Sequence, residues 1–444
     1  MRSRAATAAL LLTLIMKLQN YVLAFCSAMY AVVLLAWFSL QPVPALQDFL
    51  EWVFQSWAFG RLLAGDPAYS VHFSLVHYPV PNMFAQLFMA GVSAFASPFV
   101  AAKIFIACYI CFGALVCYRL ARRFAPNAAV PAFVLLLGLA VFNACFWHGY
   151  VNYQISLLLI LFYVDLTAET RPTVPLVFVF GLLLFCCHAS MFAAFGLLVL
   201  LREWRRPGRM SIYASLLPGV ALLALYFIRR PGHNPSHGVA TQTLLSHLAY
   251  KGYTIAKAGP FHNLVIADGT SATRWHSLYK TGVALNFGFA VVLLALVVSS
   301  WPHLYAKLKD RPERWIYLGV LASLFLLLPS DIAEVVNLGE RFLYLLALLL
   351  IFDLASSRWL PVLAWLTIAG FALTLVQIPA ASLHGTSAPE AFHQPPGREG
   401  RAYAQDGLFS HRLYQNDERR IELRVPGTPL DPLLFDTGLL SNKP

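Results

Sequence analysis

The chain has 444 residues, of which 59% are hydrophobic and only 12% are charged, and its apolar runs recur as far as residue 378. This balance excludes a soluble globular protein, because a soluble fold has no interior large enough to bury so many apolar runs. A helix needs roughly 20 apolar residues to cross a bilayer, and several runs reach that length. The runs lack the alternation of a transmembrane barrel strand, so we expect an all-α, polytopic integral membrane protein.

The net charge of +11 does not indicate a nucleic-acid partner. Basic residues gather at the ends of apolar runs, where cytoplasmic loops of membrane proteins carry them. No basic face with interleaved aromatic residues lies outside these runs. The seven cysteines also lie within apolar runs, so the sequence predicts no disulfide framework.

The first apolar run is too short to cross a membrane and lies between Arg4 and Lys17. It is either a signal-like segment or an over-extended start, so residues 1–18 are treated as a separate N-terminal cytoplasmic segment. Spans are then predicted at 20–40, 101–118, 128–147, 150–166, 212–228, 281–300, 314–329, 342–355 and 360–378.

Two further segments, 81–98 and 173–201, do not fit a single span. The basic clusters that follow 101–118 and 173–201 both lie in the cytoplasm only if 81–98 does not cross, so that it lies in the outer interface or dips in and out of the membrane. The same rule folds 173–201 into two half-spans, with His188 at the outer tip of the break. We therefore predict a bundle of about eleven membrane helices in the plasma membrane (the inner membrane of a bacterium), with the N-terminus inside and the C-terminus outside.

This topology divides the chain into the N-terminal segment, a transmembrane domain at 19–379 and an extracytoplasmic tail at 380–444. The large extracytoplasmic segments of the domain are 41–100 and 229–280. The tail is polar and rich in Pro and Gly, which predicts a loosely held appendage.

The loop at 41–100 begins with FLEWVFQSWAFGRLL, whose apolar residues follow helical spacing. This pattern predicts an amphipathic helix lying in the membrane interface, anchored by Trp52 and Trp57. Gly65-Asp66-Pro67 ends the helix, because Gly and Pro interrupt helices and Asp favours turns. Asp66 is therefore predicted to be structural rather than catalytic.

The opening of the chain resembles that of the GT-C glycosyltransferases, integral-membrane enzymes that take a sugar from a polyprenyl-phosphate carrier. The shared pattern is an Asp just beyond the first span, a helix ending in Gly-Asp-Pro-x-Tyr, an aromatic residue and Tyr-Pro-x-Pro. The residues that carry it are Asp48, Gly65, Asp66, Pro67, Tyr69, Phe73, Tyr78, Pro79 and Pro81. The likeness covers residues 1–125 and, more loosely, 126–205, where many members have a Lys near the break at which this chain has His188.

The resemblance implies transfer of a hexose or pentose from the lipid carrier to an envelope glycan or lipid on the outer face, with Asp48 as the catalytic base. Such a reaction needs a base for the acceptor's proton and cations for the leaving phosphate. Glu51 shares a helix face with Asp48 and is a second candidate catalytic residue. It either orients the acceptor or binds a cation, or it is a solvated residue.

Candidates for the phosphate lie at the predicted outer edge. Arg229 and Arg230 end a span against the positive-inside trend, which fits an anionic head group or ordinary snorkelling. Arg341 precedes a span and is either a phosphate ligand or neutralised by Glu340. His188 is an ionisable group in apolar surroundings, which indicates function or a hydrogen-bonded packing residue.

Tyr78 and His77 complete the predicted substrate-binding set. His72 and His77 could bind a metal together with Asp48, but their spacing matches no strong pattern. No metal or other cofactor is predicted, although a divalent cation is left open. Asn143 and Asn152 are expected to bridge helices, and Asp165 is expected to be solvated or to pair helices.

The expected partners are the lipid-linked donor, the envelope acceptor and membrane lipids. Two other classes stay open: a permease or lipid flippase without chemistry, and a structural partner of an envelope complex. A transporter predicts charged residues near mid-membrane on several spans, whereas here the charges lie at the edges.

Overall fold

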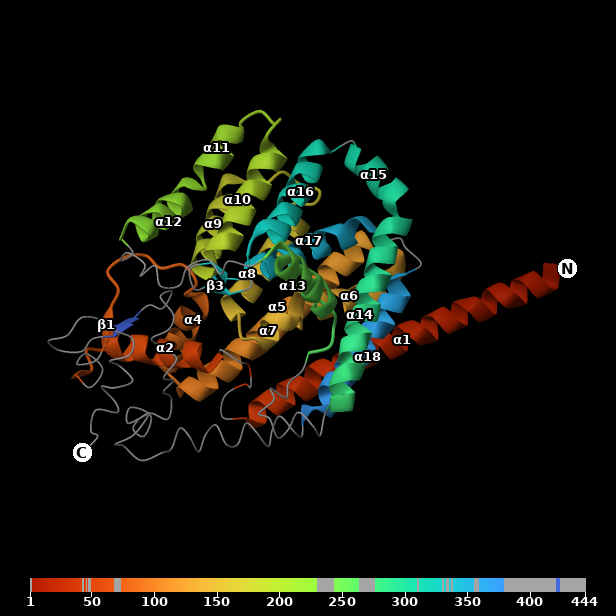
Figure 1. The fold of residues 1–444 in the computed structure, drawn as a ribbon, viewed down its shortest axis with the longest axis horizontal. Coiled ribbons are helices and arrows are strands. Elements are labelled where there is room, and N and C mark those ends of the chain that lie inside the picture. The colour runs from red at the N-terminus through yellow and green to blue at the C-terminus, as the bar shows by residue number, and fades with distance from the viewer. Residues whose placement is uncertain are drawn as a thin grey trace.

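The computed structural model describes residues 2–41, 44, 46, 49–67, 73–229, 243–262, 276–309, 311–329, 331–332, 335–336, 338–354, 359–378 and 421–423. These residues form a bundle of helices with two short ladders of strands (Figure 1). By length and composition, four helical segments among them can cross a membrane: Leu14–Leu40, Pro98–Phe124, Arg209–Arg229 and Lys280–Ser299. These segments fit a helical membrane protein.

Helix α1 (Arg2–Leu40) is continuous over 39 residues, so no helix end marks the predicted boundary at residue 18. At 1.5 Å per residue it is about 58 Å long, well beyond the hydrocarbon core of a bilayer. Its N-terminal part projects from the bundle, and its C-terminal part packs against α6 (Ala129–Leu136) and α18 (Leu360–Val376) (Figure 1).

Helix α2 (Phe49–Leu63) confirms the helix predicted in the first loop, but its position corrects one expectation. Trp52 is buried, with 6% exposure, and its Nε1 donates to the carbonyl of Gly149 at 3.0 Å. It is thus a packing residue and not a membrane-interface anchor. Asp66 forms an ion pair with Arg61 beyond the helix, which agrees with a structural role.

The apolar segment after the prolines forms only α4 (Phe84–Ser93), which packs against α2 and α5 (Pro98–Phe124). Ten residues extend about 15 Å, half the thickness of the hydrocarbon core. The expectation that 81–98 does not cross is therefore consistent with the structure.

The predicted span at 128–147 is interrupted. After η1 (Pro126–Ala128) and α6 the chain forms a π-helical turn, η2 (Leu137–Val141), and then the short helix α7 (Ala144–Trp147). Asn143 causes the restart: its side chain accepts from the backbone N–H of Phe146 as a helix cap and donates to the Leu139 carbonyl at 2.8 Å.

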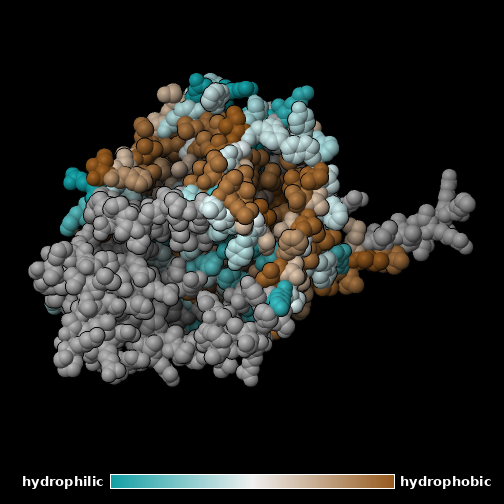
Figure 2. Space-filling view, in the orientation of Figure 1, coloured by the Kyte–Doolittle hydropathy of each residue, from teal (hydrophilic) through white to brown (hydrophobic). Residues whose placement is uncertain are grey.

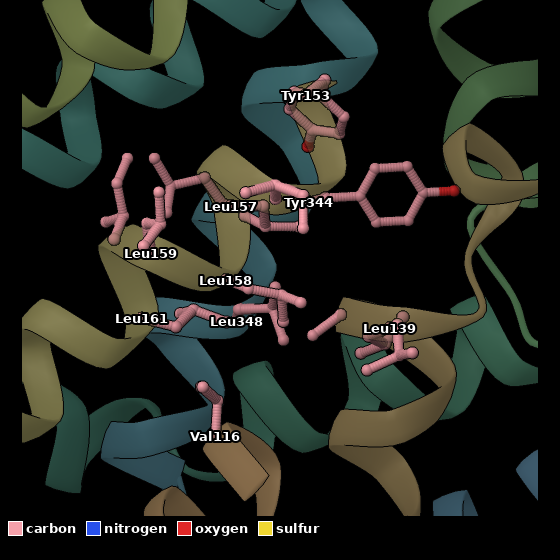
Figure 3. Close-up of a cluster of buried hydrophobic side chains, with 14 of the residues drawn as sticks. Val116, Leu139, Tyr153, Leu157, Leu158, Leu159, Leu161, Tyr344 and Leu348 are labelled. Atoms are coloured by element: carbon pink, nitrogen blue, oxygen red, sulfur yellow. The ribbon is translucent and has the colours of Figure 1, made fainter. Parts of the chain in front are cut away.

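Helix α8 (Val151–Leu166) runs through the middle of the bundle and is buried on all sides. Figure 3 shows its Leu158 and Leu161 beside Leu348 of α17 (Leu338–Leu354), with Val116 of α5 below them. A helix that is apolar all round must be enclosed by others. Its Asn152 binds the Asn82 carbonyl and the Ala85 N–H, confirming the predicted bridge.

The break predicted within 173–201 is confirmed. Helices α9 (Val174–Cys187) and α10 (Ala189–Glu203) are separated at His188, which has an extended backbone with φ −166° and ψ 124°. The start of α9 and the end of α10 lie close together, because Arg171 binds Glu203 at 3.2 Å and the Pro207 carbonyl at 2.6 Å. The two helices therefore form a hairpin with His188 at its tip.

The remaining described helices complete the bundle: α11 (Arg209–Ala214), α12 (Leu217–Arg229), α13 (Leu244–Lys257), α14 (His276–Ser299), α15 (Trp301–Lys309) and α16 (Pro312–Leu327). Strand β2 (Asp331–Ile332) pairs with β3 (Val335–Val336). Strand β1 (Phe73–Leu75) pairs with β4 (Ile421–Leu423), so the tail expected to be loose is tied to the first loop at this point.

The basic clusters predicted to be cytoplasmic share one end of the bundle. Arg119 and Arg123 both bind Asp165 at the end of α8, at 2.6 and 2.7 Å, so Asp165 pairs helices. Arg202 binds the hydroxyl of Thr167, just beyond the same helix end, at 2.5 Å. The first residues of α8, the His188 tip and the start of α17 lie at the opposite end.

Candidate functional site

Two predicted site residues meet at the tip of the α9–α10 hairpin. The Nη1 atom of Arg341 is hydrogen-bonded to Nε2 of His188, and both residues are at least 93% buried. A guanidinium only donates, so Nε2 must accept and the imidazole proton lies on Nδ1. Nδ1 is 2.8 Å from Oγ of Ser190, to which it donates. His188 is thereby fixed in one neutral tautomer.

Aromatic rings and a backbone contact hold Arg341 from the other side. Its guanidinium carbon lies 4.9 Å from the ring centre of Tyr150 and 5.9 Å from that of Tyr153. The Tyr153 hydroxyl donates to the Arg341 carbonyl at 2.8 Å. These contacts fix the cation in a low-dielectric setting, where its field is less screened than in water.

A second charged group, centred on Lys257 at the end of α13, lies beside the first. Its Nζ is 3.2 Å from Oε1 of Glu340 and 3.3 Å from Nε2 of His148. The Glu340 carboxylate thus forms an ion pair with Lys257, and the charge of its neighbour Arg341 also acts on it. We call Arg341, His188, Lys257, His148 and Glu340 the charged cluster.

Burial controls the ionisation of the acid and the histidines at this end of the bundle. It raises the pKa of Glu340 above its ordinary value, while Lys257, Arg341 and Lys251 act in the opposite direction. Burial and then the Lys257 ammonium lower the pKa of His148 to about 4. The pKa of His262, whose ring centre lies 5.3 Å from that of His148, is also lowered, mainly by burial. Two cationic side chains thus face one acid whose charge is disfavoured, which favours an incoming anion.

The turn between α7 and α8 connects the cluster to the first loop. Gly149 adopts φ +80°, a left-handed conformation that glycine tolerates, and its neighbours are His148 and Tyr150. Its carbonyl is the one that accepts from Trp52 in the first turn of α2. Asp48 immediately precedes α2 in sequence but lies outside the described residues, as does the side chain of Glu51.

Other predicted site residues lie along the neighbouring segment, 76–83. The ring of Tyr78 is 6.2 Å from that of Tyr226, one turn before the end of α12. The backbone N–H of Met83 donates to the Cys186 carbonyl at 2.7 Å, which ties this segment to the hairpin tip. His77 and Arg229 are exposed, and no described contact joins them to the cluster. Arg230 lies outside the described residues.

The structure describes only some of the residues of the candidate metal site. Among the side chains that the structure describes, no group of three or more His, Cys, Asp or Glu could hold a metal ion. His72 and Asp48 are not among them.

Sequence reasoning missed Lys257 and His148. Lys251 and Lys257 both occur in the predicted outer loop 229–280, against the positive-inside trend that singled out Arg229. The positive-inside rule, applied to these two lysines, would have identified α13 as a candidate site element. His148 carried no comparable signal, since one histidine in a short turn between apolar runs is ordinary.

No protein-family model, curated protein or solved structure matches this chain. Its function is therefore argued from the charged cluster and from the residue pattern of the first loop.

Proposed function

We propose that this protein is a membrane glycosyltransferase that moves a sugar from a polyprenyl-phosphate carrier to an envelope glycan or lipid at the outer face of the plasma membrane. The observation that carries the proposal is the convergence of Arg341, Lys257, His188 and His148 at one end of the bundle. They lie beside the turn to which α2 is bound, and α2 directly follows the predicted base, Asp48.

The cluster suits a lipid phosphate because its cations are buried and held by fixed partners. Leaving-group departure puts negative charge on the carrier phosphate, and preorganised donors stabilise such charge most in a water-poor site. Arg341 offers a planar fork suited to two phosphate oxygens, whereas Lys257 offers a point charge. Glu340 holds Lys257 in place, and the anionic head group would balance the remaining positive charge.

The proposed topology has about eleven membrane helices, with the N-terminus inside and the C-terminus outside. It is supported by the gathering of Arg119, Arg123 and Arg202 at one end of the bundle, with the charged cluster at the other. In this orientation the α9–α10 hairpin enters from the cytoplasmic side and presents His188 towards the outer face.

In the proposed reaction, Asp48 takes the proton of the acceptor hydroxyl as its oxygen attacks the anomeric carbon. The bond from that carbon to the carrier phosphate breaks, through a transition state with oxocarbenium character. The phosphate leaves with the bonding electron pair and is stabilised by Arg341 and Lys257. Glu51, one turn further along α2, would orient the acceptor.

The test uses purified protein, lipid-linked sugar and an acceptor extract. Asp48→Asn preserves size but cannot accept the proton, so turnover should fall by about 100-fold or more with folding and donor binding intact. Glu51→Gln should lower turnover by a smaller factor. Asp66→Asn is the matched control, because Asp66 pairs with Arg61 and should have little effect on turnover. Transfer by Asp48→Asn at the parental rate would contradict the proposal.

A comparison of a deletion strain with its parent separates the enzyme from the transport alternative. A missing envelope sugar with accumulated polyprenyl-phosphate sugar supports the transferase. Loss of a transported solute, with envelope glycans unchanged, favours the permease.

A further inference from the structure

A cavity of about 130 Å³ lies at the end of the bundle opposite to the charged cluster, and three arginines line it. They are Arg202 at the end of α10 and Arg311 and Arg314 at the start of α16. One acid, Glu313, shares the lining. A water molecule takes up about 30 Å³ of liquid, so the cavity has room for a group of the size of a phosphate.

Two acids near the cavity, among the residues that the structure describes, are engaged by other arginines. Asp165 binds Arg119 and Arg123, and Glu203 binds Arg171 and Arg206. Arg202 binds Thr167, a neutral group that holds the guanidinium in place without cancelling its charge. The described lining carries three arginines against one acid, so positive charge exceeds negative charge among its side chains.

The positive charges of neighbouring arginines also disfavour the charged form of Arg202. Burial lowers the pKa of Arg202, and although Tyr163 and Glu203 oppose this effect, the positive charges of Arg206 and Arg311 add to it. Like charges brought together around a cavity are relieved by a bound anion.

The rest of the cavity wall is apolar, with Leu198 and Leu201 of α10 facing Leu318 of α16. The adjoining surface is exposed and apolar as well, at Leu200 on α10 and Ile316 on α16. Figure 2 shows hydrophilic residues along the top edge of the molecule and a band of hydrophobic residues below them. A cationic cavity at such a boundary fits a molecule with an anionic head and apolar tails.

We propose that this cavity binds the phosphate of one anionic membrane phospholipid, whose acyl chains lie along α10 and α16. The lipid would join the end of the α9–α10 hairpin to α16 as a structural component. This site is separate from the charged cluster and does not depend on the proposed glycosyl transfer.

The experiment uses the full chain in nanodiscs of phosphatidylcholine with or without phosphatidylglycerol. Thermal unfolding is measured in the nanodiscs, and native mass spectrometry after extraction counts retained lipids. The wild type should retain one phosphatidylglycerol and unfold at a higher temperature when that lipid is present. Arg311→Gln should weaken retention about tenfold, the scale of one charge-assisted hydrogen bond. Arg205→Gln is the matched control, because Arg205 is an exposed arginine at the same end but outside the cavity lining.

Equal retention by the Arg311→Gln and Arg205→Gln variants would overturn the proposal. Glu313→Gln provides a second measurement if Arg311→Gln does not fold: removal of the lining acid should strengthen retention, and unchanged retention would contradict the site. Inorganic phosphate separates the two sources of the anion. If it raises the unfolding temperature in phosphatidylcholine as much as phosphatidylglycerol does, the cavity takes free phosphate and the lipid assignment fails.

Discussion

Arg341 and His188 lie 153 positions apart in the chain but form one unit, because the hydrogen bond between them requires a neutral imidazole with its proton on Nδ1. The same geometry leaves the guanidinium between this imidazole and the face of Tyr150. At the scale of the residue, Arg341 is therefore the described candidate that we expect to bind the phosphate of the proposed carrier.

We expect Arg341→Gln to raise the KM for the lipid-linked donor about tenfold or more, because it removes a charge-assisted contact to the phosphate. Arg341→Lys should have an intermediate effect, since it keeps the charge but loses the fork and the planar contact with Tyr150. Steady-state kinetics with varied donor provide the measurement. Arg122→Gln, an exposed arginine at the opposite end, is the control. A donor KM unchanged in Arg341→Gln at an unchanged melting temperature would make Arg341 an interfacial anchor only.

The titration of His148 predicts a loss of stability in acid. Its pKa is lowered from 6.5 to about 4, so the folded state binds fewer protons than the unfolded state between these values. The histidine's contribution to stability is therefore full above pH 6.5 and is lost as the pH falls towards 4. Glu340, whose pKa is raised, contributes with the opposite sign, in favour of the folded state at low pH.

A comparison of the wild type with His148→Gln separates the effect of His148 on stability from that of Glu340. We expect the melting temperature of His148→Gln to fall less steeply between pH 6.5 and 4 than that of the wild type. His77→Gln, at an exposed histidine outside the charged cluster, is the control. Parallel profiles for the wild type and His148→Gln would show that His148 is not protected from protonation in the folded protein.

At the scale of the element, α2 is attached to the bundle by its buried face and by side-chain hydrogen bonds of Gln55 and Trp52. Phe49, Val53 and Ala58 have no exposed surface, and Trp52 binds the Gly149 carbonyl from the same face. If α2 carries the base to the charged cluster, this bond should affect catalysis as well as stability.

Trp52→Phe tests this role, because it keeps an aromatic ring and removes only the indole N–H. The loss of one buried hydrogen bond should reduce the free energy of unfolding by about 1 kcal/mol, and turnover should fall through displacement of the start of α2. Trp57→Phe, on the half-buried part of the helix, is the control. If both variants keep the parental turnover while only Trp52→Phe melts earlier, the bond is structural and does not position the base.

At the scale of the whole molecule, the two polar ends of the bundle differ in kind. One end carries many arginines that bind Asp165, Glu203 and Thr167, and the other carries the charged cluster with its histidines and aromatic rings. This asymmetry is the basis of the proposed orientation, since cytoplasmic ends of membrane proteins are rich in Arg and Lys.

Cysteine labelling tests the orientation in intact cells. In a background without the seven native cysteines, reporters at Ser97 and Ser387 should react with an impermeant reagent from outside, and one at Ser211 should not. Ser97 caps the start of α5, Ser211 lies in α11, and Ser387 falls outside the described residues. Labelling of Ser211 from outside, or protection of Ser387, would reverse the ends and move the charged cluster to the cytoplasmic side.

The sequence by itself determined the features that depend on neighbours along the chain. Apolar runs set the positions of the helices, the length and charged flanks of 173–201 marked the break at His188, and Gly65-Asp66-Pro67 marked the end of α2. Basic residues at the ends of runs predicted that both flanks of 173–201 would lie on the same side, and Arg171 binds Glu203 there. These features follow from hydrophobic length, turn chemistry and the cost of placing charge in lipid, all of which act locally.

Only the tertiary structure decided which side chains face each other across the bundle. The Arg341–His188 bond, the Lys257–Glu340 pair and the burial of Trp52 against Gly149 each join segments that are far apart in the chain. A helical period shows which face of a helix is apolar, but not which helix covers that face or at what height. Those choices are fixed by the packing of all the helices together, and that packing placed Lys257 and His148 beside residues that the sequence marked as site candidates.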